Sequence, residues 1–590
     1  MCGIFALLNN KTTFNNKTIE KAFNVLNTQG PEYSNFELHT NKLFLGFKRL
    51  AINGLTNEPQ QPITIDGIRL ICNGEIYNYK ILFNELYKSN KILPQTGSVC
   101  EVIIHLYKLY GIEQTLRLLD GVFSFVLYDY SDDNCDPKIF VARDPFGVKP
   151  LYMMRKQQNI YDDKNIYNNS NITHENIIGF ASEIKTLHPI LYSDKDVLLY
   201  NSKINTFNND KIYNGVYKSY EIVPFEPGTY SIYSIDFKVN AQWKNIIQNK
   251  KYICTNFPCT MLNYNYMESI DEIYRQIVYN LENAVMKRVM GTRDRPIVCL
   301  LSGGLDSSLI TSFVKKHYNG ELKTFSIGME GSPDLKYARF VADHLQTNHT
   351  EITVTEDDFF NAIPNVIETI ESYDTATVRD SVGNYLVGKY ISENTDASVV
   401  FNGDGCDELT GGYLYFLNSP SSIEFDKECR RLLANIHTFD VLRSDRCISC
   451  HGLETRTPFL DRTFVDFYLS LPINLRNPLI SNIRSQKCEK QLLRSSIQTV
   501  YPRLLPYNVL WRTKEAFSDG ISCNPGLWYE IMQRKLQSIN IKYDDKINYI
   551  HNNPTTVEQQ YYRKIYDKFY YGTEKCIPYF WMPKYVDADD

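Results

Sequence analysis

Hydrophobic and polar residues follow two different patterns along the chain. Up to residue 220, short alternating or apolar runs such as Lys42–Ala51, Ile68–Cys72 and Val122–Asp129 stand between turn residues, which is typical of β-strands. From residue 265 onward, long amphipathic stretches such as Met267–Arg288 favour helices. The pattern therefore predicts a β-rich α+β region followed by an α/β region.

Three compact apolar runs in the second region predict buried parallel strands: Pro296–Leu301, Lys323–Gly328 and Ala397–Phe401. Each run leads into a loop rich in Gly or Asp. Because ligands bind at the carboxyl ends of strands in open α/β sheets, we expect a binding site where these loops meet.

The change of pattern also predicts the domain organisation. We expect one domain over residues 1–220, a connecting segment over 221–264, a second domain over 265–575 and a tail over 576–590. Two asparagine-rich segments are expected to be surface loops, because polar runs bury too little surface to fold by themselves. They cover residues 157–176 and 201–214.

Composition narrows the class of protein. The 590 residues are 43% hydrophobic and carry a net charge of −5, so no broad basic surface suggests nucleic acid or a membrane as partner. No apolar run has the length of a membrane span, and the first residues do not resemble a secretory signal. Fourteen cysteines are too few for a disulfide scaffold. We expect a cytoplasmic protein.

Cys2 is the first residue with candidate chemistry. Removal of Met1 would leave a free α-amine, with a pKa of about 7.7–8.0, beside a thiol that it can deprotonate. Arg49 ends an apolar run, and its guanidinium is suited to bidentate binding of a carboxylate. Asn73 and Gly74 supply an amide side chain and a backbone N–H that could form an oxyanion hole.

Together with residues 142–151 and 180–185, these segments resemble the class II glutamine amidotransferases, which have an N-terminal-nucleophile fold of stacked antiparallel β-sheets between helices. The resemblance implies that Cys2 attacks the side-chain amide of glutamine and releases ammonia, with Asn73 and Gly74 stabilising the oxyanion. The glutamine-binding residues implied in the same way are Arg49, Leu50, Ala51, Ile52, Asn53, Asn73, Gly74, Glu75 and Val99.

Two positions depart from that family pattern. An acid that pairs with the α-ammonium of glutamine is usual where this chain has Val99, and Arg-Gly-Pro-Asp is usual where it has Gln29-Gly30-Pro31-Glu32. We therefore expect weakened binding of glutamine with an intact nucleophile.

A second motif, Ser302-Gly303-Gly304-Leu305-Asp306-Ser307-Ser308, lies between a predicted strand and the predicted helix Ser307–His317. Glycines let backbone N–H groups approach phosphate oxygens, and a helix N-terminus favours an anion. The serine hydroxyls can donate to the anion, and Asp306 could hold Mg²⁺. Because no Gly-Lys-Ser/Thr follows, this is not a Walker loop.

This loop resembles the PP-loop of the N-type ATP pyrophosphatases, which cleave ATP to AMP and pyrophosphate. With residues 323–344, 402–409, 451–461 and 511–520, the resemblance extends to the glutamine-hydrolysing asparagine synthetases over nearly the whole chain. It implies a parallel-sheet domain, Mg²⁺ as cofactor on Asp306 and Asp407, and catalytic roles for Asp404, Arg379 and Lys514. The ATP-binding residues it implies are Leu300, Ser302, Gly303, Gly304, Asp306, Ser307, Ile327, Asn402 and Gly403.

The resemblance implies ATP, L-aspartate and L-glutamine as substrates, a β-aspartyl-AMP intermediate, an internal ammonia channel and a homodimer as a candidate assembly. Asp404 is one methylene shorter than the usual glutamate, and Ala376 replaces a usual threonine, so we expect an unaffected fold and a lower rate. Two alternatives stay open: an amidotransferase for another carboxylate acceptor, and a catalytically degraded regulatory relative.

Overall fold

The computed structural model describes residues 2–10, 14–39, 42–55, 61–132, 135–157, 176–192, 220–236, 241–253, 269–292, 294–481, 483, 487–514, 520, 528–547, 549 and 551–585. The asparagine-rich segment 201–214 and most of 157–176 lie outside these residues, as does the motif segment 515–519.

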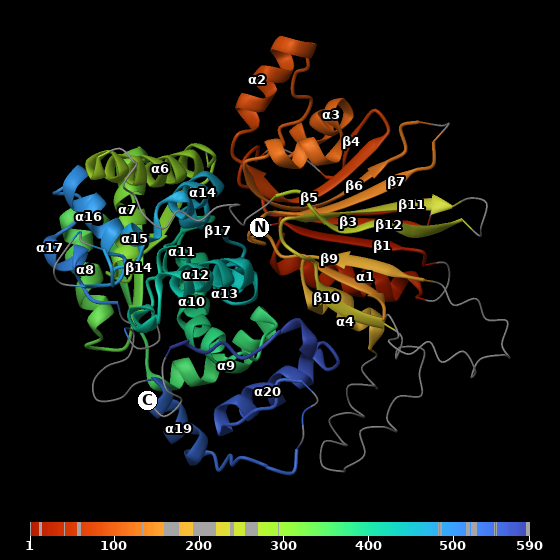
Figure 1. Ribbon diagram of the computed structural model, residues 1–590. Helices are drawn as coiled ribbons and strands as arrows, with labels where there is room; N and C mark the ends of the chain where they lie inside the picture. Colours follow the sequence, from red (N-terminus) through yellow and green to blue (C-terminus); the bar gives the residue numbers. More distant parts are fainter. Residues whose placement is uncertain are drawn as a thin grey trace.

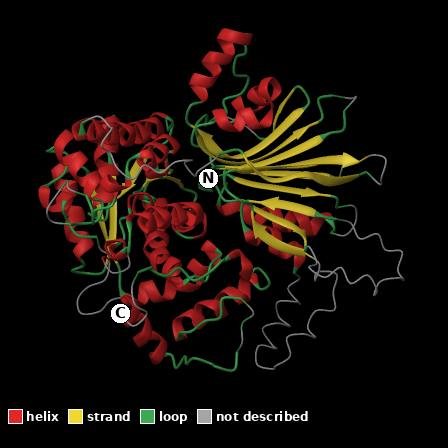
Figure 2. Ribbon diagram, in the orientation of Figure 1, coloured by secondary structure: helices red, strands yellow, loops and turns green. Residues whose placement is uncertain are grey.

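Two six-stranded antiparallel sheets stack face to face in the N-terminal half (Figure 1, Figure 2). The first has the order β10-β8-β9-β1-β3-β2 and the second the order β12-β11-β7-β6-β5-β4. The strands of the first sheet are β1 (Gly3–Leu8), β2 (Tyr33–His39), β3 (Leu43–Arg49), β8 (Tyr152–Lys156), β9 (Ile178–Ala181) and β10 (Tyr220–Pro224). Those of the second are β4 (Ile63–Ile65), β5 (Ile68–Ile76), β6 (Gly121–Asp129), β7 (Lys138–Arg143), β11 (Thr229–Asp236) and β12 (Gln242–Lys251).

Alternation along β1 explains the stacking. Ile4 and Ala6 face the second sheet, whereas Phe5 and Leu7 face helices α1 (Asn16–Asn24) and α4 (Ile184–Leu191). Helices α2 (Tyr79–Asn90) and α3 (Val102–Leu118) cover the other outer face (Figure 1). The predicted fold of stacked sheets between helices is confirmed, and Cys2 immediately precedes a central strand.

The predicted connecting segment, 221–264, contributes to these sheets instead of only joining the domains. Strands β10, β11 and β12 lie within residues 220–251. Their contribution was missed because β12 is an edge strand whose side chains are mostly polar and not buried, a pattern that resembles a linker. Residues 254–264 of the segment lie outside the described part of the chain.

The C-terminal half contains a five-stranded parallel sheet of order β15-β14-β13-β16-β17, as predicted. Its strands are β13 (Ile297–Leu300), β14 (Lys323–Gly328), β15 (Asn348–Thr353), β16 (Val399–Phe401) and β17 (Glu454–Arg456). The α-helices around it are α6 (Ile270–Met290), α7 (Leu305–His317), α8 (Pro333–Leu345), α9 (Glu356–Ile370), α10 (Thr375–Asn394), α11 (Cys406–Thr410), α12 (Ser422–Asn435), α13 (Asp440–Ser449), α14 (Arg462–Ser470), α15 (Ile473–Arg476), α16 (Gln491–Val500), α17 (Tyr507–Leu510), α19 (Trp528–Ser538) and α20 (Val557–Tyr570).

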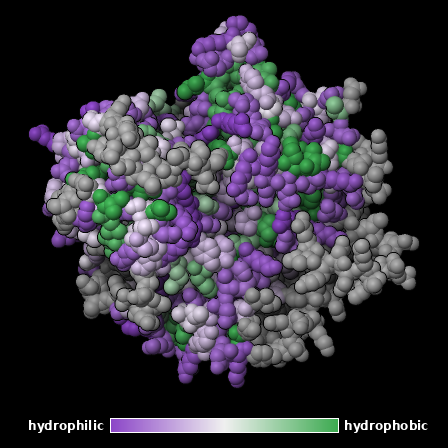
Figure 3. Space-filling model, viewed as in Figure 1, coloured by the Kyte–Doolittle hydropathy of each residue, from purple (hydrophilic) through white to green (hydrophobic). Residues whose placement is uncertain are grey.

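The two halves share a hydrophobic core. Leu50 and Ile52, which follow β3, pack in one cluster with Ile273, Ile277 and other residues of α6. The loop predicted to bind glutamine therefore rests on the C-terminal half. Among the residues coloured in Figure 3, hydrophilic ones predominate, with small apolar patches between them. Among the described helices, none combines the length and apolar character needed to cross a membrane.

Candidate active sites

The sheet that contains β1 places the Cys2 thiol beside the predicted glutamine loop. The thiol is half-buried and donates to the carbonyl oxygen of Leu50, with the sulfur 3.8 Å from that oxygen. Burial raises the pKa of Cys2 to about 11. Since the thiolate is the nucleophile, a thiol with so high a pKa needs a base when it attacks.

Asn73 and Gly74 lie next to each other on β5. The Asn73 side chain is fully buried, and neither its nitrogen nor its oxygen has a hydrogen-bond partner among the described residues. Buried polar atoms are nearly always paired, so an unpaired amide points to a ligand that completes it. A Cβ on Gly74 would lie 2.5 Å from the Val122 carbonyl oxygen, so only glycine fits against β6 there.

Arg49 braces the loop that follows β3. Its guanidinium donates to the carbonyl oxygen of Asn53 at 3.2 Å and to that of Gly54. Leu50, Ala51 and Ile52 are buried. The contact of Arg49 with a glutamine carboxylate stays a prediction.

Glu75 and Val99 define the predicted site for the amino-acid head. The Glu75 carboxylate lies 3.6 Å from the Arg456 guanidinium of β17. Burial raises the pKa of Glu75 to about 7, although Arg456 opposes the rise. Val99 is buried in the apolar cluster beneath α2 and α3. The nearby Glu101 accepts from the backbone N–H of Gln95 at 2.7 Å and the Thr96 hydroxyl at 2.7 Å, so it is engaged in holding its own loop.

The predicted phosphate loop connects β13 to α7. Gly303 has a φ of +73°, and a Cβ there would lie 2.4 Å from the backbone of Tyr337, so the turn requires glycine. The Ser302 and Ser307 hydroxyl oxygens lie 3.1 Å apart, and the Ser302 N–H donates to the Ser307 hydroxyl at 3.2 Å. Both hydroxyls thus face one another across the mouth of the loop, next to the α7 N-terminus.

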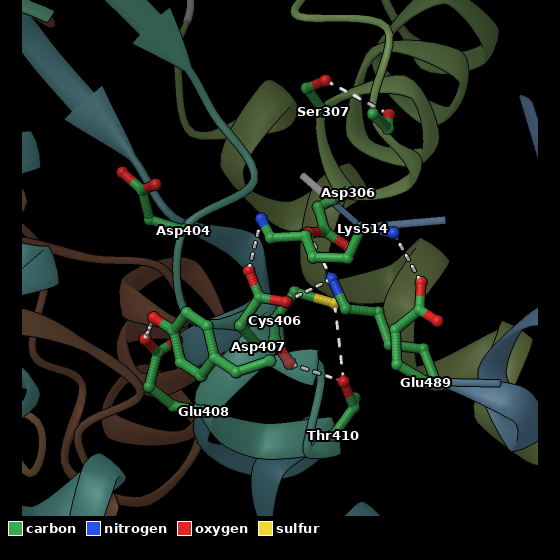
Figure 4. A network of polar contacts seen from close by, with 12 residues as sticks. Asp306, Ser307, Asp404, Cys406, Asp407, Glu408, Thr410, Glu489 and Lys514 are labelled. Carbon is green, nitrogen blue, oxygen red and sulfur yellow. Dashed lines mark hydrogen bonds and ion pairs between the residues drawn. The ribbon is translucent and has the colours of Figure 1, made fainter. Parts of the chain in front are cut away.

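Acidic and basic side chains lie in contact with one another beside this loop (Figure 4). The Lys490 ammonium lies 2.5 Å from carboxylate oxygens of both Asp306 and Asp407, and the Lys514 ammonium lies 2.9 Å from Asp407. Burial alone would raise the pKa of Asp407, but the two lysines outweigh it and hold that pKa well below its usual range. A ligand bearing several negative charges would meet two ammonium groups here.

The two aspartates also fit a divalent cation. One oxygen of Asp306, Oδ1, has no hydrogen-bond partner among the described residues. Mg²⁺ is usually bound through one or two carboxylates together with substrate phosphates, and this pair meets that requirement. Within the described residues, no group of three or more His, Cys, Asp or Glu side chains could hold a metal ion.

A cavity of about 910 Å³ surrounds this network. Such a volume suits a nucleotide-sized ligand. All residues predicted for this site line the cavity except Gly303, which makes the turn. The predicted residues that line it are Leu300, Ser302, Gly304, Asp306, Ser307, Ile327, Arg379, Asn402, Gly403, Asp404, Asp407 and Lys514.

Asp404 and Arg379 are held from outside the phosphate loop. The Asp404 carboxylate accepts from the Asn402 amide at 2.7 Å and lies 3.3 Å from the Arg443 guanidinium. Burial raises the pKa of Asp404 to about 6, and Arg443 opposes the rise. Arg379 donates to both carboxylate oxygens of Glu558 on α20, at 2.8 and 2.6 Å.

Three residues of this site were missed by the sequence analysis: Lys490, Arg443 and Trp581. No motif links Lys490 to aspartates so distant in the sequence. Trp581 lines the cavity from the segment predicted as a tail, and its backbone N–H donates to Asp374 at 2.6 Å. The segment predicted as a tail therefore contributes Trp581 and Pro583 to the wall of the site.

Fold and geometry together define a class: a glutamine amidotransferase domain joined to an ATP-using synthetase domain. Residues 1–243 match the family model of the glutamine amidotransferase domain, and residues 276–424 and 418–538 match that of asparagine synthase. The chain is 36% identical over 616 aligned positions to the asparagine synthetase [glutamine-hydrolyzing] of Homo sapiens, covering 100% of this chain and 97% of that one. The relatives of the same name from Gallus gallus and Bos taurus are 37% and 36% identical with the same coverage. The chain belongs to the family of glutamine-hydrolysing asparagine synthetases.

Proposed function

We propose that this chain converts L-aspartate, ATP and glutamine into L-asparagine, glutamate, AMP and pyrophosphate, using the residues described above. As a member of its family, it is an enzyme of glutamine-dependent asparagine synthesis. The observation that carries the proposal is that nearly all the predicted ATP-site residues line one cavity of about 910 Å³.

In the first site, the α-amine left by removal of Met1 takes the proton of the Cys2 thiol, and the thiolate attacks the glutamine amide carbon. The unpaired Asn73 amide and the Gly74 N–H donate to the oxyanion that develops. Collapse of the tetrahedral intermediate releases ammonia, and water then hydrolyses the thioester to glutamate.

In the second site, the ATP phosphates bind over the Ser302–Ser307 loop and the α7 N-terminus. Asp306 and Asp407 would hold Mg²⁺, which supplies charge neutralisation when bound. Lys490 and Lys514 line the same cavity and would offset the charge of the departing pyrophosphate. The aspartate β-carboxylate attacks the α-phosphorus, which gives β-aspartyl-AMP.

Ammonia then attacks the acyl carbon of the adenylate and displaces AMP. We assign Asp404 the role of binding the aspartate ammonium or of accepting the proton that ammonia loses. Arg379 lines the same cavity and is held in place by Glu558. The complete set of charges argues for an active enzyme over a degraded regulatory relative.

The test is to incubate purified protein with ATP and aspartate, and to measure asparagine, AMP and pyrophosphate with either glutamine or ammonium as nitrogen donor. We expect asparagine and pyrophosphate in equal amounts with both donors. Release of ADP and phosphate, or pyrophosphate release only with a different carboxylic acid, would contradict the proposal.

A further inference from the structure

The loop predicted to bind glutamine is held by residues of the other domain. The Asn53 side-chain amide donates to the carbonyl oxygen of Gly291 at 2.7 Å, and the Gly54 N–H donates to the Asp294 carboxylate at 2.8 Å. Both partners lie just after α6, in the synthetase domain. The far end of the glutamine loop is thus fixed from outside its own domain.

Arg295 fixes the middle of the same loop. Its Nε donates to the carbonyl oxygen of Ala51 at 2.9 Å, and its terminal nitrogen pairs with the Glu32 carboxylate. Glu32 also accepts a hydrogen bond from the Ala51 N–H. The two polar backbone groups of Ala51 are therefore both bound, one to Arg295 and the other to Glu32.

The segment that makes these contacts also leads along the chain to the nucleotide site. The segment 291–295 leads directly into β13, and β13 ends at the phosphate loop that begins with Ser302. Leu50 and Ile52 pack in the same hydrophobic cluster as α6. One short stretch of the synthetase domain thus contacts the glutamine loop at its start and leads to the nucleotide site at its end.

We propose that Arg295, together with Glu32 and Asp294, is a positioning residue for glutamine binding that the synthetase domain supplies to the glutaminase domain. This inference rests on the proposed role of residues 49–53 in binding glutamine. Ordering a loop at the moment of binding lowers affinity, and a loop already fixed avoids that cost. The Arg295 and Glu32 side chains are 26% and 35% exposed, so the ion pair alone contributes little. Its effect comes from holding the Ala51 backbone.

The test uses glutaminase kinetics of the full-length protein. For Arg295→Ala we expect the KM for glutamine to rise about tenfold, the value of one lost charge-assisted hydrogen bond, with kcat within about twofold and ammonia-dependent synthesis unchanged. Arg295→Lys keeps the charge but lacks the fork that reaches two acceptors, so its KM should be intermediate. Glu32→Gln retains an acceptor for the Ala51 N–H and should give a smaller rise than Arg295→Ala.

Arg462→Ala is the matched control. Arg462 also crosses between the domains, donating to the carbonyl oxygen of Arg117 at 3.0 Å, but it does not contact the glutamine loop. We expect its glutamine KM to equal that of the wild type. An equal KM rise in both variants, or an equal loss of ammonia-dependent synthesis in Arg295→Ala, would overturn the positioning role.

Arg49→Ala separates this inference from the proposed function. If Arg49→Ala raises the glutamine KM and Arg295→Ala does not, the positioning role is wrong and the glutamine site stands. If neither variant changes the KM, residues 49–53 do not bind glutamine and the proposed site itself is wrong.

Discussion

The two sites of this chain differ in how burial acts on the pKa values of their acidic groups. Around Cys2, burial raises the pKa of the thiol to about 11 and that of Glu75 to about 7, with Arg456 3.6 Å from Glu75, and position 99 is valine. Around Asp407, two aspartates and two lysines lie in direct contact. The difference matches the ligands, since a glutamine amide is neutral whereas ATP is a polyanion.

The two sites therefore respond differently to the loss of one side chain. In the first site, the loss of one group removes the nucleophile or changes affinity for one small ligand. In the second, the loss of one charge leaves the opposite charges of the network only partly compensated, which is costly. Substitutions should therefore affect the two half-reactions separately, and the size of each effect should follow the role of the group.

The largest difference between glutamine-dependent and ammonia-dependent synthesis is expected from Cys2→Ala. Glutamine-dependent synthesis should fall on the order of 10⁴-fold or more, because no other group forms the thioester. Ammonia-dependent synthesis should stay within about twofold, because the synthetase cavity is untouched. Asparagine formation with each donor measures both, and a parallel loss of the two activities would disprove separate sites.

Lys490→Met should disable the synthetase site. Removing the ammonium leaves the half-buried Asp306 without Lys490 and the buried Asp407 with Lys514 as its remaining partner, at a cost of up to about 3–5 kcal/mol. We expect pyrophosphate release to fall at least a hundredfold with either donor, whereas glutamine hydrolysis persists. Lys316→Ala, which removes a partly exposed lysine paired with Glu282, is the control and should change neither rate. Normal pyrophosphate release by Lys490→Met would show that the charge network is dispensable.

Val99→Asp should improve the first site. A carboxylate there would give the glutamine α-ammonium a charge-assisted hydrogen bond, worth about 1.5–3 kcal/mol. We expect the glutamine KM in a glutaminase assay to fall ten- to a hundredfold, with ammonia use unaffected. Equal KM values for the variant and the wild type would mean that another group already binds the ammonium.

The smallest effect concerns the pH dependence of glutamine binding. Glu75 has a pKa raised to about 7, so below that pH it is protonated and cannot pair with an ammonium. We expect the glutamine KM to rise about tenfold as the pH falls from 8 to 6. Glu75→Gln should show a high KM that no longer varies over this range; a wild-type KM that is constant with pH would exclude Glu75 from the pairing.

Residues whose role is set locally could be predicted from the sequence. A strand, two glycines and the start of a helix are enough to form the Ser302–Ser307 loop, so its function can be recognised from one short segment of sequence. The two-domain order and the parallel strands were predicted for the same reason, because each pattern is local.

Residues brought together by packing could not be predicted. Lys490 acquires its role from Asp306 and Asp407, which lie on different elements, and Arg295 from a loop in the other domain. The polar edge strand β12 was read as a linker because its side chains are mostly not buried. In each case the role of the residue or strand depends on neighbours in space that are distant in the sequence.

If the two sites act as one enzyme, ammonia released at Cys2 is used in the synthetase cavity. The most direct test supplies amide-¹⁵N glutamine, ATP and aspartate in the presence of excess unlabelled ammonium, and measures the isotope content of the asparagine formed. We expect asparagine far richer in ¹⁵N than the ammonium in solution, with one pyrophosphate per asparagine. Asparagine that carries only the isotope ratio of the dissolved ammonium would show that the two sites do not act together.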